Sequence, residues 1–206
     1  MAESCRFTVV NIGTLSMNKF WHETERVRSA AATCTLLEMR EWRVLVDPSP
    51  GPEDLEPILF ARTGLSPADI DMVFLTHFHG DHRYGIALFA GKPWLMAPDG
   101  LAEWKAQSSQ DADVIRLIRP AERYLPEGIT LFPSPGHTKG HHSLIVSTEW
   151  GPLVVAGDAV MARDFFDAEE GYHNSVDLAQ AAHTIRHIRD SAALLIPGHD
   201  NLILNL

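Results

Sequence analysis

Short apolar runs rich in Val, Leu, Thr and aromatic residues recur along the chain, separated by glycine, proline and polar residues. Runs of this length and composition favour β-strands. They predict strands at 7–12, 33–39, 42–46, 70–76, 94–97, 129–132, 144–147, 153–156 and 193–196. The runs on either side of the polar turn around Glu149 and Gly151 are close enough together to form a hairpin.

Helical spacing of apolar residues appears between these strands. The clearest case is 176–189, where apolar residues recur on one face, and 53–61 has the same character and is followed by Gly64. Shorter helices are predicted at 84–89 and 101–107. Strands that alternate with helices in this way indicate an α/β fold.

Composition limits the classes that need to be considered. The chain has 206 residues, of which 45% are hydrophobic, so it can bury one sizeable core, and we expect a single domain over 1–206. The formal net charge of −10 disfavours nucleic acid as a partner, because affinity for phosphate backbones depends on clustered Lys and Arg. The charge therefore argues against a nuclease without excluding one, and a small-molecule substrate is expected.

No signal peptide and no apolar run of membrane-spanning length is evident in the sequence. We therefore expect a soluble, cytoplasmic protein with no membrane partner. Cys5 and Cys34 are too few for a disulfide scaffold and too far apart for a zinc knuckle, so reduced packing residues are expected. Nothing in the sequence fixes the oligomeric state, and a homodimer is compatible with it.

Four metal-ligand side chains lie within six positions directly after the apolar run 72–75. This segment has the sequence His77-Phe78-His79-Gly80-Asp81-His82. Imidazole nitrogen and carboxylate oxygen are ligands that zinc-like divalent ions prefer. A strand that ends in a loop can direct alternate side chains at one centre.

Three further candidates have the same context, since each follows an apolar run and stands directly after a glycine: His137, Asp158 and His199. Glycine permits the sharp turns and close backbone approaches that a metal centre at several strand ends requires. Five histidines and two aspartates suffice for two ions that share a carboxylate. Such a pair can hold a hydroxide and polarise a substrate oxygen, which indicates a hydrolase.

These motifs resemble those of the metallo-β-lactamase fold superfamily. The resemblance rests on the HxHxDH run at 77–82, on Pro135-Gly136-His137-Thr138 with His141 following, on Gly157-Asp158 and on Pro197-Gly198-His199. The motifs occur in the family's order and span most of the chain. The resemblance implies a four-layer αβ/βα sandwich with the site along one edge of the two sheets.

The resemblance also implies roles for the ligand candidates. His77, His79 and His137 would hold one ion, Asp81, His82 and His199 the other, and Asp158 would bridge the two. The implied cofactors are two divalent ions, most often Zn, although Mn and Fe accept the same ligands. The implied nucleophile is a metal-bridging hydroxide, with Asp81 also handling a proton as the catalytic side chain.

Three differences from particular branches narrow the substrate class. β-Lactamases of the superfamily lack a bridging Asp at the position of Asp158, which favours the thioesterase, lactonase and phosphodiesterase branches. Acyl-homoserine lactonases carry a Tyr where this chain has Met161. The chain ends seven residues after His199, without the helical region with which glyoxalase II enzymes bind glutathione, so a glutathione thioesterase is not expected.

We therefore predict a dinuclear metal-dependent hydrolase acting on a small ester-like, lactone or thioester substrate. A phosphodiesterase or ribonuclease of the same fold is the main alternative. A mononuclear iron sulfur dioxygenase and a non-catalytic binding scaffold are further alternatives. Metal analysis separates the oxygenase from the hydrolases.

The segment 13–32 is too long for a tight turn between its flanking strands, and we call it the 13–32 loop. It carries Phe20, Trp21 and His22, and it is predicted to be either an apolar flap over the substrate or an anchor to the core or to another subunit. The sequence leaves these two options open.

Four other histidines lie outside the predicted ligand set. The resemblance implies that His141 supports, through hydrogen bonds, the loop that carries His137. His173 is predicted either to line the pocket as a proton donor or to be an ordinary loop residue. His183 and His187 stand four apart without the Glu of an HExxH motif, which favours a solvated helix face.

Overall fold

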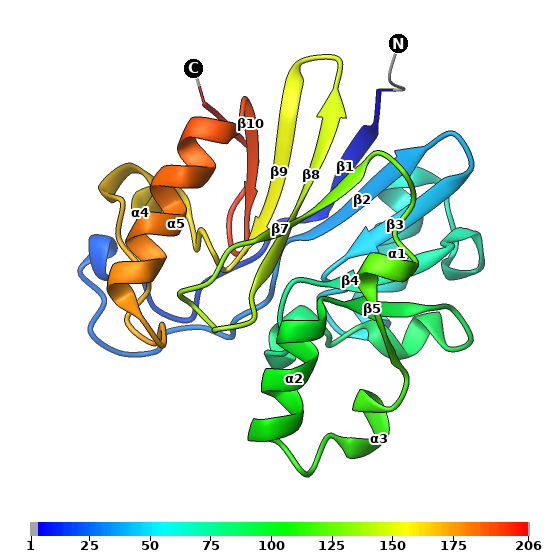
Figure 1. Cartoon of the computed structure of the whole chain (residues 1–206), viewed down its shortest axis with the longest axis horizontal. Coiled ribbons are helices and arrows are strands. Elements are labelled where there is room, and N and C mark those ends of the chain that lie inside the picture. Colours follow the sequence, from blue (N-terminus) through cyan, green and yellow to red (C-terminus); the bar gives the residue numbers. More distant parts are fainter. Residues whose placement is uncertain (1–3, 206) are drawn as a thin grey trace.

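The computed structural model describes residues 4–205 and contains two mixed β-sheets that pack face to face (Figure 1). The first sheet has the strand order β1-β2-β3-β4-β5-β6. The pairs β1–β2 and β2–β3 are antiparallel, whereas the pairs from β3 to β6 are parallel. The bounds of these strands are Arg6–Asn11, Cys34–Met39, Trp42–Val46, Met72–Leu75, Trp94–Met96 and Ile118–Pro120.

The second sheet has the order β11-β10-β9-β8-β7. Its only parallel pair is β9–β10, and β8 and β9 form the predicted hairpin. The bounds from β7 to β11 are Ile129–Pro133, His142–Thr148, Gly151–Gly157, Leu194–Pro197 and Ile203–Leu204.

Helices cover the outer face of each sheet, which gives four layers (Figure 1). The first sheet is covered by α1 and α2, with the short α3 beside α2, and the second by α4 and α5. Their bounds are Pro52–Thr63, Pro98–Gln107, Ala112–Ile115, Arg163–Ala168 and Leu178–Ser191. The predicted αβ/βα sandwich is therefore confirmed.

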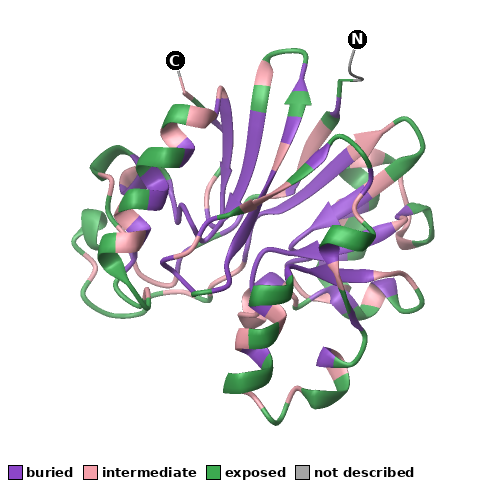
Figure 2. Cartoon of the chain, viewed as in Figure 1, coloured by how far each residue is buried: buried purple, intermediate pink, exposed green. Residues whose placement is uncertain are grey.

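Alternation along the strands produces this layering, because successive side chains point to opposite faces of a sheet. In β3, Val44 and Val46 pack between the sheets while Leu45 faces α1. In β10, Leu194 faces the other sheet and Leu195 faces α5. Both faces of the central strands are thus buried, and Figure 2 shows the buried positions concentrated in the strands. Burial of both faces explains why the sequences of these strands are continuous apolar runs.

Most predicted elements are confirmed within a few residues, and the strand at 42–46 is found at its predicted bounds. The prediction of a helix at 84–89 was wrong for its first residues. The chain instead forms 3₁₀ turns at Gly80–His82 and Ile86–Phe89, and Gly85 lies so close to the backbone carbonyl of Pro50 that only a glycine fits there. The sequence analysis did not predict α3, α4, β6 or β11, which are short elements of two to six residues.

Among the described residues, the longest helix is α5, and no helix has the length and apolar character needed to cross a membrane. Cys5 and Cys34 are buried and unbridged, as expected for packing residues.

Candidate metal centre

The seven predicted ligands meet at one edge of the sandwich, where strands from both sheets end. His77 and His79 follow β4, and Asp81 and His82 lie in the next 3₁₀ turn. His137 lies between β7 and β8, whereas Asp158 and His199 follow β9 and β10 directly. Side chains that are up to 122 positions apart in the sequence thus converge because their strands end together.

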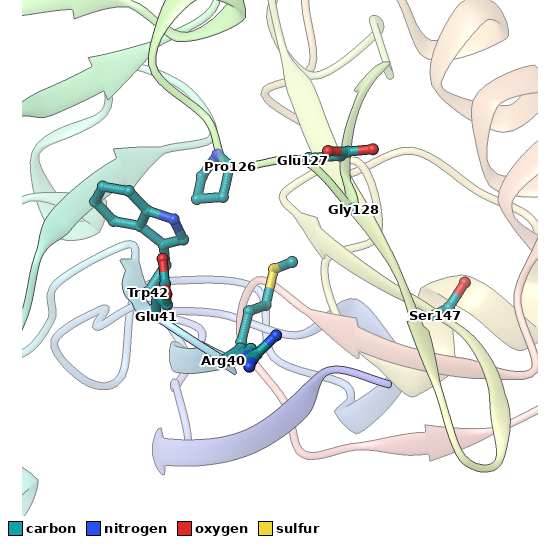
Figure 3. Close-up of a pocket in the computed structure, with 8 residues that line it drawn as sticks. Arg40, Glu41, Trp42, Pro126, Glu127, Gly128 and Ser147 are labelled. Atoms are coloured by element: carbon teal, nitrogen blue, oxygen red, sulfur yellow. The ribbon is translucent and has the colours of Figure 1, made fainter. Parts of the chain in front are cut away.

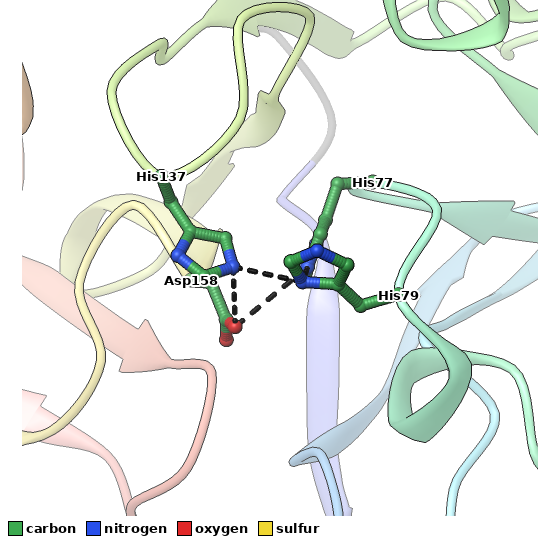
Figure 4. Close-up of side chains that lie close together, drawn as sticks. All are labelled: His77, His79, His137 and Asp158. Carbon is green, nitrogen blue, oxygen red and sulfur yellow. Dashed lines mark hydrogen bonds and ion pairs between the residues drawn. The ribbon is translucent and has the colours of Figure 1, made fainter. Parts of the chain in front are cut away.

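The first group of ligand atoms comes from three histidines and Asp158 (Figure 4). Nδ1 of His79 lies 2.9 Å from Nε2 of His77 and 2.9 Å from Nε2 of His137. Oδ2 of Asp158 lies 3.1 Å from Nε2 of His137 and 3.6 Å from Nε2 of His77. All four atoms lie within 4.8 Å of one another, as ligands of a single ion would.

The second group consists of Asp81, His82 and His199, whose ligand atoms also lie within 4.8 Å of one another. Oδ1 of Asp158 is directed at this group, 3.0 Å from Nε2 of His82 and 3.2 Å from Nε2 of His199. Oδ2 of Asp81 lies 3.6 Å from Nε2 of His199. Asp158 therefore presents one oxygen to each group.

Hydrogen bonds behind the second group fix which imidazole nitrogen faces the centre. Nδ1 of His82 lies 2.8 Å from Oδ2 of Asp47, and a carboxylate can only accept, so this nitrogen carries the proton. Nδ1 of His199 donates to the carbonyl oxygens of Thr14 and Ala31, at 3.0 and 2.9 Å. Nε2 is therefore the nitrogen of each ring that faces the centre, and in the neutral form it directs its lone pair there.

Asp47 is a functional residue that the sequence analysis missed. Its carboxylate also accepts from the backbone N–H and the hydroxyl of Thr76, at 2.9 and 2.8 Å, and that hydroxyl oxygen lies 3.1 Å from Nδ1 of His77. One carboxylate therefore orients a histidine of each group. The sequence did contain a signal for Asp47, because this residue directly follows a strand, as the recognised ligands do. That strand, β3, lies beside β4 and parallel to it.

Burial and charge set the protonation of the cluster. Burial lowers the pKa of His77 well below its usual value and lowers that of His137 to about 4. For His82, burial acts in the same direction, but Asp158 and Asp47 outweigh it and raise the pKa. Burial opposes the ionised form of Asp158, yet the surrounding histidines outweigh it and lower its pKa. The three histidines of the first group thus favour the neutral form, and together with the ionised Asp158 they form the donor set that a divalent cation requires.

Polar atoms without partners point to the same conclusion. Nε2 of His82 and Oδ1 of Asp158 are buried and make no hydrogen bond with the described residues. Buried polar atoms are normally paired, and lone pairs that face one another repel unless a proton or a cation lies between them. The residues present thus fit divalent ions at both groups.

His141 supports the ligand loop from behind. It is fully buried, and its Nδ1 lies 2.8 Å from the hydroxyl of Ser134, just upstream of His137. A carboxylate from α2 holds the same loop, because Glu103 accepts from the backbone N–H groups of Lys139 and Gly140, at 3.1 and 2.7 Å. The sequence analysis did not find Glu103, which has no strand-end context.

A cavity of about 690 Å³ opens beside the cluster. His79, Asp81, Asp158 and His199 are exposed to it, and Met161 and Tyr172 contribute to its wall. From the 13–32 loop it receives Leu15, Ser16, Arg26, Arg28, Ser29 and Ala30. Its size is within the usual range for a small-molecule site.

The aromatic residues predicted as a flap lie elsewhere in the described structure. Phe20 packs edge-on against Phe165 of α4 at 5.0 Å, and the exposed Trp21 lies beside the guanidinium of Arg28. His22 is exposed and is not among the cavity residues. Phe20 therefore anchors the loop to α4 within this chain.

His173 is exposed and lines a smaller neighbouring cavity of about 310 Å³, which Tyr172 separates from the cluster. His183 and His187 both lie on the exposed face of α5, as the spacing indicated. Neither belongs to a metal-ligand group among the described residues.

Another cavity, of about 490 Å³, lies at the opposite end of the strands (Figure 3). It is lined by the β2–β3 turn, by the residues before β7 and by Ser147 near the end of β8. Among the described residues that line it are two carboxylates, Glu41 and Glu127, but no histidine or cysteine. Its residues offer no metal-ligand group, so the chemistry belongs to the other edge.

Comparisons with known proteins agree with this geometry. Residues 30–199 match the model of the metallo-β-lactamase superfamily. An N-acyl homoserine lactonase from a Bacillus species is 25% identical over 203 residues, covering 81% of this chain and 80% of the lactonase. The human metallo-β-lactamase domain-containing protein 1 is 28% identical over 187 residues, covering 83% of this chain and 63% of that protein.

The fold has counterparts among solved structures. The AiiA protein of Bacillus thuringiensis, determined with N-decanoyl-L-homoserine bound at its active site, superposes with a TM-score of 0.70 at 21% identity. The match covers 97% of this chain and 94% of that one. The ligand groups, the fold and the family match together identify the chain as a hydrolase of the metallo-β-lactamase superfamily.

Proposed function

We propose that this protein is a dinuclear metal-dependent hydrolase acting on a small ester-like, lactone or thioester substrate. The observation that carries the proposal is the placement of Asp158, with Oδ2 among the first three histidines and Oδ1 among the second group. A carboxylate that faces two ligand sets in this way supports two neighbouring ions. One ion alone, at the first group, would leave only a proton to link Oδ1 of Asp158 to Nε2 of His82.

The side chains divide the work between binding and proton transfer. His77, His79 and His137 would hold one ion, Asp81, His82 and His199 the other, and Asp158 both. When bound, two divalent ions activate water as a nucleophile and polarise the substrate oxygen. Asp81 is the least buried of the carboxylates at the centre and lies on the cavity wall, so it is placed to take a proton and return it to the leaving group.

Ester-like substrates are favoured over phosphodiesters on two grounds. The relatives named as N-acyl homoserine lactonases act on a lactone, as their name states. The acidic chain, with a formal net charge of −10, disfavours a polyanionic substrate. The intact second group supports two ions rather than the single iron of a sulfur dioxygenase.

Metal quantification together with a substrate panel tests the proposal. The protein is loaded with Zn, Mn or Fe, and hydrolysis of lactones, thioesters, phosphodiesters and β-lactams is measured. We expect two ions per chain, turnover of a lactone or thioester, and a loss of at least about 100-fold in kcat/KM for Asp158→Ala. The exposed Asp190 of α5 provides the matched control, Asp190→Ala, which should keep wild-type activity.

Two results would overturn the proposal. One is the absence of turnover on the whole panel by protein that holds two ions. The other is full activity of Asp158→Ala. Turnover of phosphodiesters alone would replace the ester substrate with the phosphodiesterase alternative.

A further inference from the structure

The cavity beside the cluster combines the ligand groups with a wall of different chemistry. The 13–32 loop closes on itself through a bridge between Thr14 and Ala31, and its residues Arg26, Arg28 and Ser29 face this cavity. A molecule bound with its reacting bond at the cluster would therefore lie against two guanidinium groups.

The charges on the cavity wall are opposite to those of the chain as a whole. The chain carries a formal net charge of −10, but the acidic residues among the described cavity lining are Asp81 and Asp158, both of them metal-ligand candidates. Divalent ions would neutralise these two carboxylates. Arg26 then gives the cavity an unpaired positive charge in an acidic protein, whereas the charge of Arg28 is balanced by Glu23.

The two arginines differ in how they are engaged. Arg28 forms an ion pair with Glu23, and its Nη1 donates to the carbonyl oxygen of Leu15 at 2.9 Å. Glu23 in turn accepts from the backbone N–H of Asn18 at 2.7 Å, so Arg28 is committed to holding the loop in shape. Arg26 makes no hydrogen bond or ion pair within residues 4–205, and its guanidinium is free for a ligand.

Arg26 is close to a second polar group of the same wall. Burial raises the pKa of the Tyr172 hydroxyl, and the positive charge of Arg26 is among the influences that oppose this rise. That hydroxyl donates to the carbonyl oxygen of Met17 at 2.8 Å, so the ring is held in place by the loop. Asn174, which also lines the cavity, adds an amide beside the guanidinium.

We propose that Arg26 binds a negatively charged group of the substrate, so that the preferred substrates are small esters, thioesters or lactones that carry a carboxylate or a phosphate. This inference rests on the proposed function and specifies its substrate class. An arginine fork pairs with either oxyanion through charge-assisted hydrogen bonds. A cavity of about 690 Å³ suits a small anion, and the formal net charge of −10 disfavours a long polyanion.

Matched ester pairs test the proposal on the metal-loaded protein. p-Nitrophenyl butyrate ends in a methyl group, and mono-(p-nitrophenyl) succinate has a carboxylate in its place. The p-nitrophenyl ester of 3-phosphonopropionate carries a phosphate-like group there instead. We expect a higher kcat/KM for the anionic esters, and the better of the two identifies the anion. In Arg26→Ala the anionic preference should fall by about 10-fold, the usual scale for losing one charge-assisted hydrogen bond.

Charge variants make the outcome specific to Arg26. Arg26→Glu should reverse the preference, and Arg26→Lys should keep part of it. Arg62→Glu on α1 makes the same charge change at an exposed residue that does not line the cavity, and it should leave the preference intact. Equal kcat/KM values for butyrate and succinate esters in the wild type would overturn the proposal, as would an anionic preference unchanged in Arg26→Glu.

Equilibrium binding separates this inference from the proposed function. Succinamate and butyramide carry no ester, and calorimetry should show tighter binding of succinamate to the wild type but not to Arg26→Glu. If this difference is found while no ester is hydrolysed, the anion site stands and the proposed hydrolysis fails. If esters are hydrolysed and succinamate gains nothing from Arg26, the hydrolase stands and the anion site is rejected.

Discussion

The backbone of Gly198 lies against the carboxylate of Asp158 so closely that a Cβ at position 198 would clash with Oδ1. That oxygen is the one directed at His82 and His199. The glycine before His199 therefore has a physical function, because it leaves room for the shared carboxylate.

Replacing this glycine should disturb the metal centre before it disturbs the fold. In Gly198→Ala the added methyl displaces Asp158, and we expect the protein to lose one or both ions. The free energy of unfolding should fall by about 1–3 kcal/mol. Metal content by mass spectrometry and urea unfolding measure the two effects. Gly51→Ala, where a Cβ meets open space, is the control. Full metal occupancy in Gly198→Ala would contradict this account.

Asp47 should affect both ions, although it lies behind the ligands. Asp47→Asn keeps the size of the side chain and suits its left-handed φ of 50°, but it weakens the acceptor that fixes His82 and, through Thr76, His77. We expect a 10–100-fold loss of metal affinity, measured by competition with a chelator. Asp54→Asn on the exposed face of α1 should leave affinity unchanged. A loss confined to one ion would show that Thr76 does not transmit the effect.

Glu103 should support the first ligand group through the 137–141 loop. Glu103→Ala removes the acceptor for the N–H groups of Lys139 and Gly140. We expect this to lower the free energy of unfolding by about 1–3 kcal/mol. Thermal unfolding with and without metal measures the change, and Glu56→Ala on α1 is the matched control. Identical melting of Glu103→Ala and the wild type would refute the role.

The two thiols should be unreactive in the folded protein. Burial is the main cause that raises the pKa of Cys5 to about 11 and that of Cys34 to about 12. A thiol reagent at pH 8 should therefore react slowly with native protein and rapidly with both thiols after denaturation.

The same shifts give a sign for the pH dependence of stability. The folded state keeps the thiol protons to higher pH than the unfolded state, whose thiols ionise near pH 9. Stability from this source is complete below pH 9 and falls as the pH rises further. Urea unfolding at pH 8 and pH 10 measures the loss, which Cys34→Ala should reduce. An equal loss in that variant would assign the effect to other groups.

The sequence alone determined the α/β architecture and pointed to the seven candidate metal ligands that the structure brings together. Strands buried on both faces appear as continuous apolar runs, and ligands at the ends of strands appear directly after those runs. Both are local patterns, so a single sequence displays them. The division of His77, His79 and His137 from Asp81, His82 and His199 came from the family resemblance and agrees with the two groups in the structure.

Only the tertiary structure decided how the ligands are oriented and what faces the substrate. Asp47 fixes His82 from 35 positions away in the sequence. The carbonyl oxygens of Ala31 and Thr14 fix His199 from 168 and 185 positions away. No local pattern encodes such pairs. The 13–32 loop shows the same limit, because its aromatic residues were the visible candidates for substrate contact. In the structure Phe20 packs against α4, and Arg26 lines the cavity.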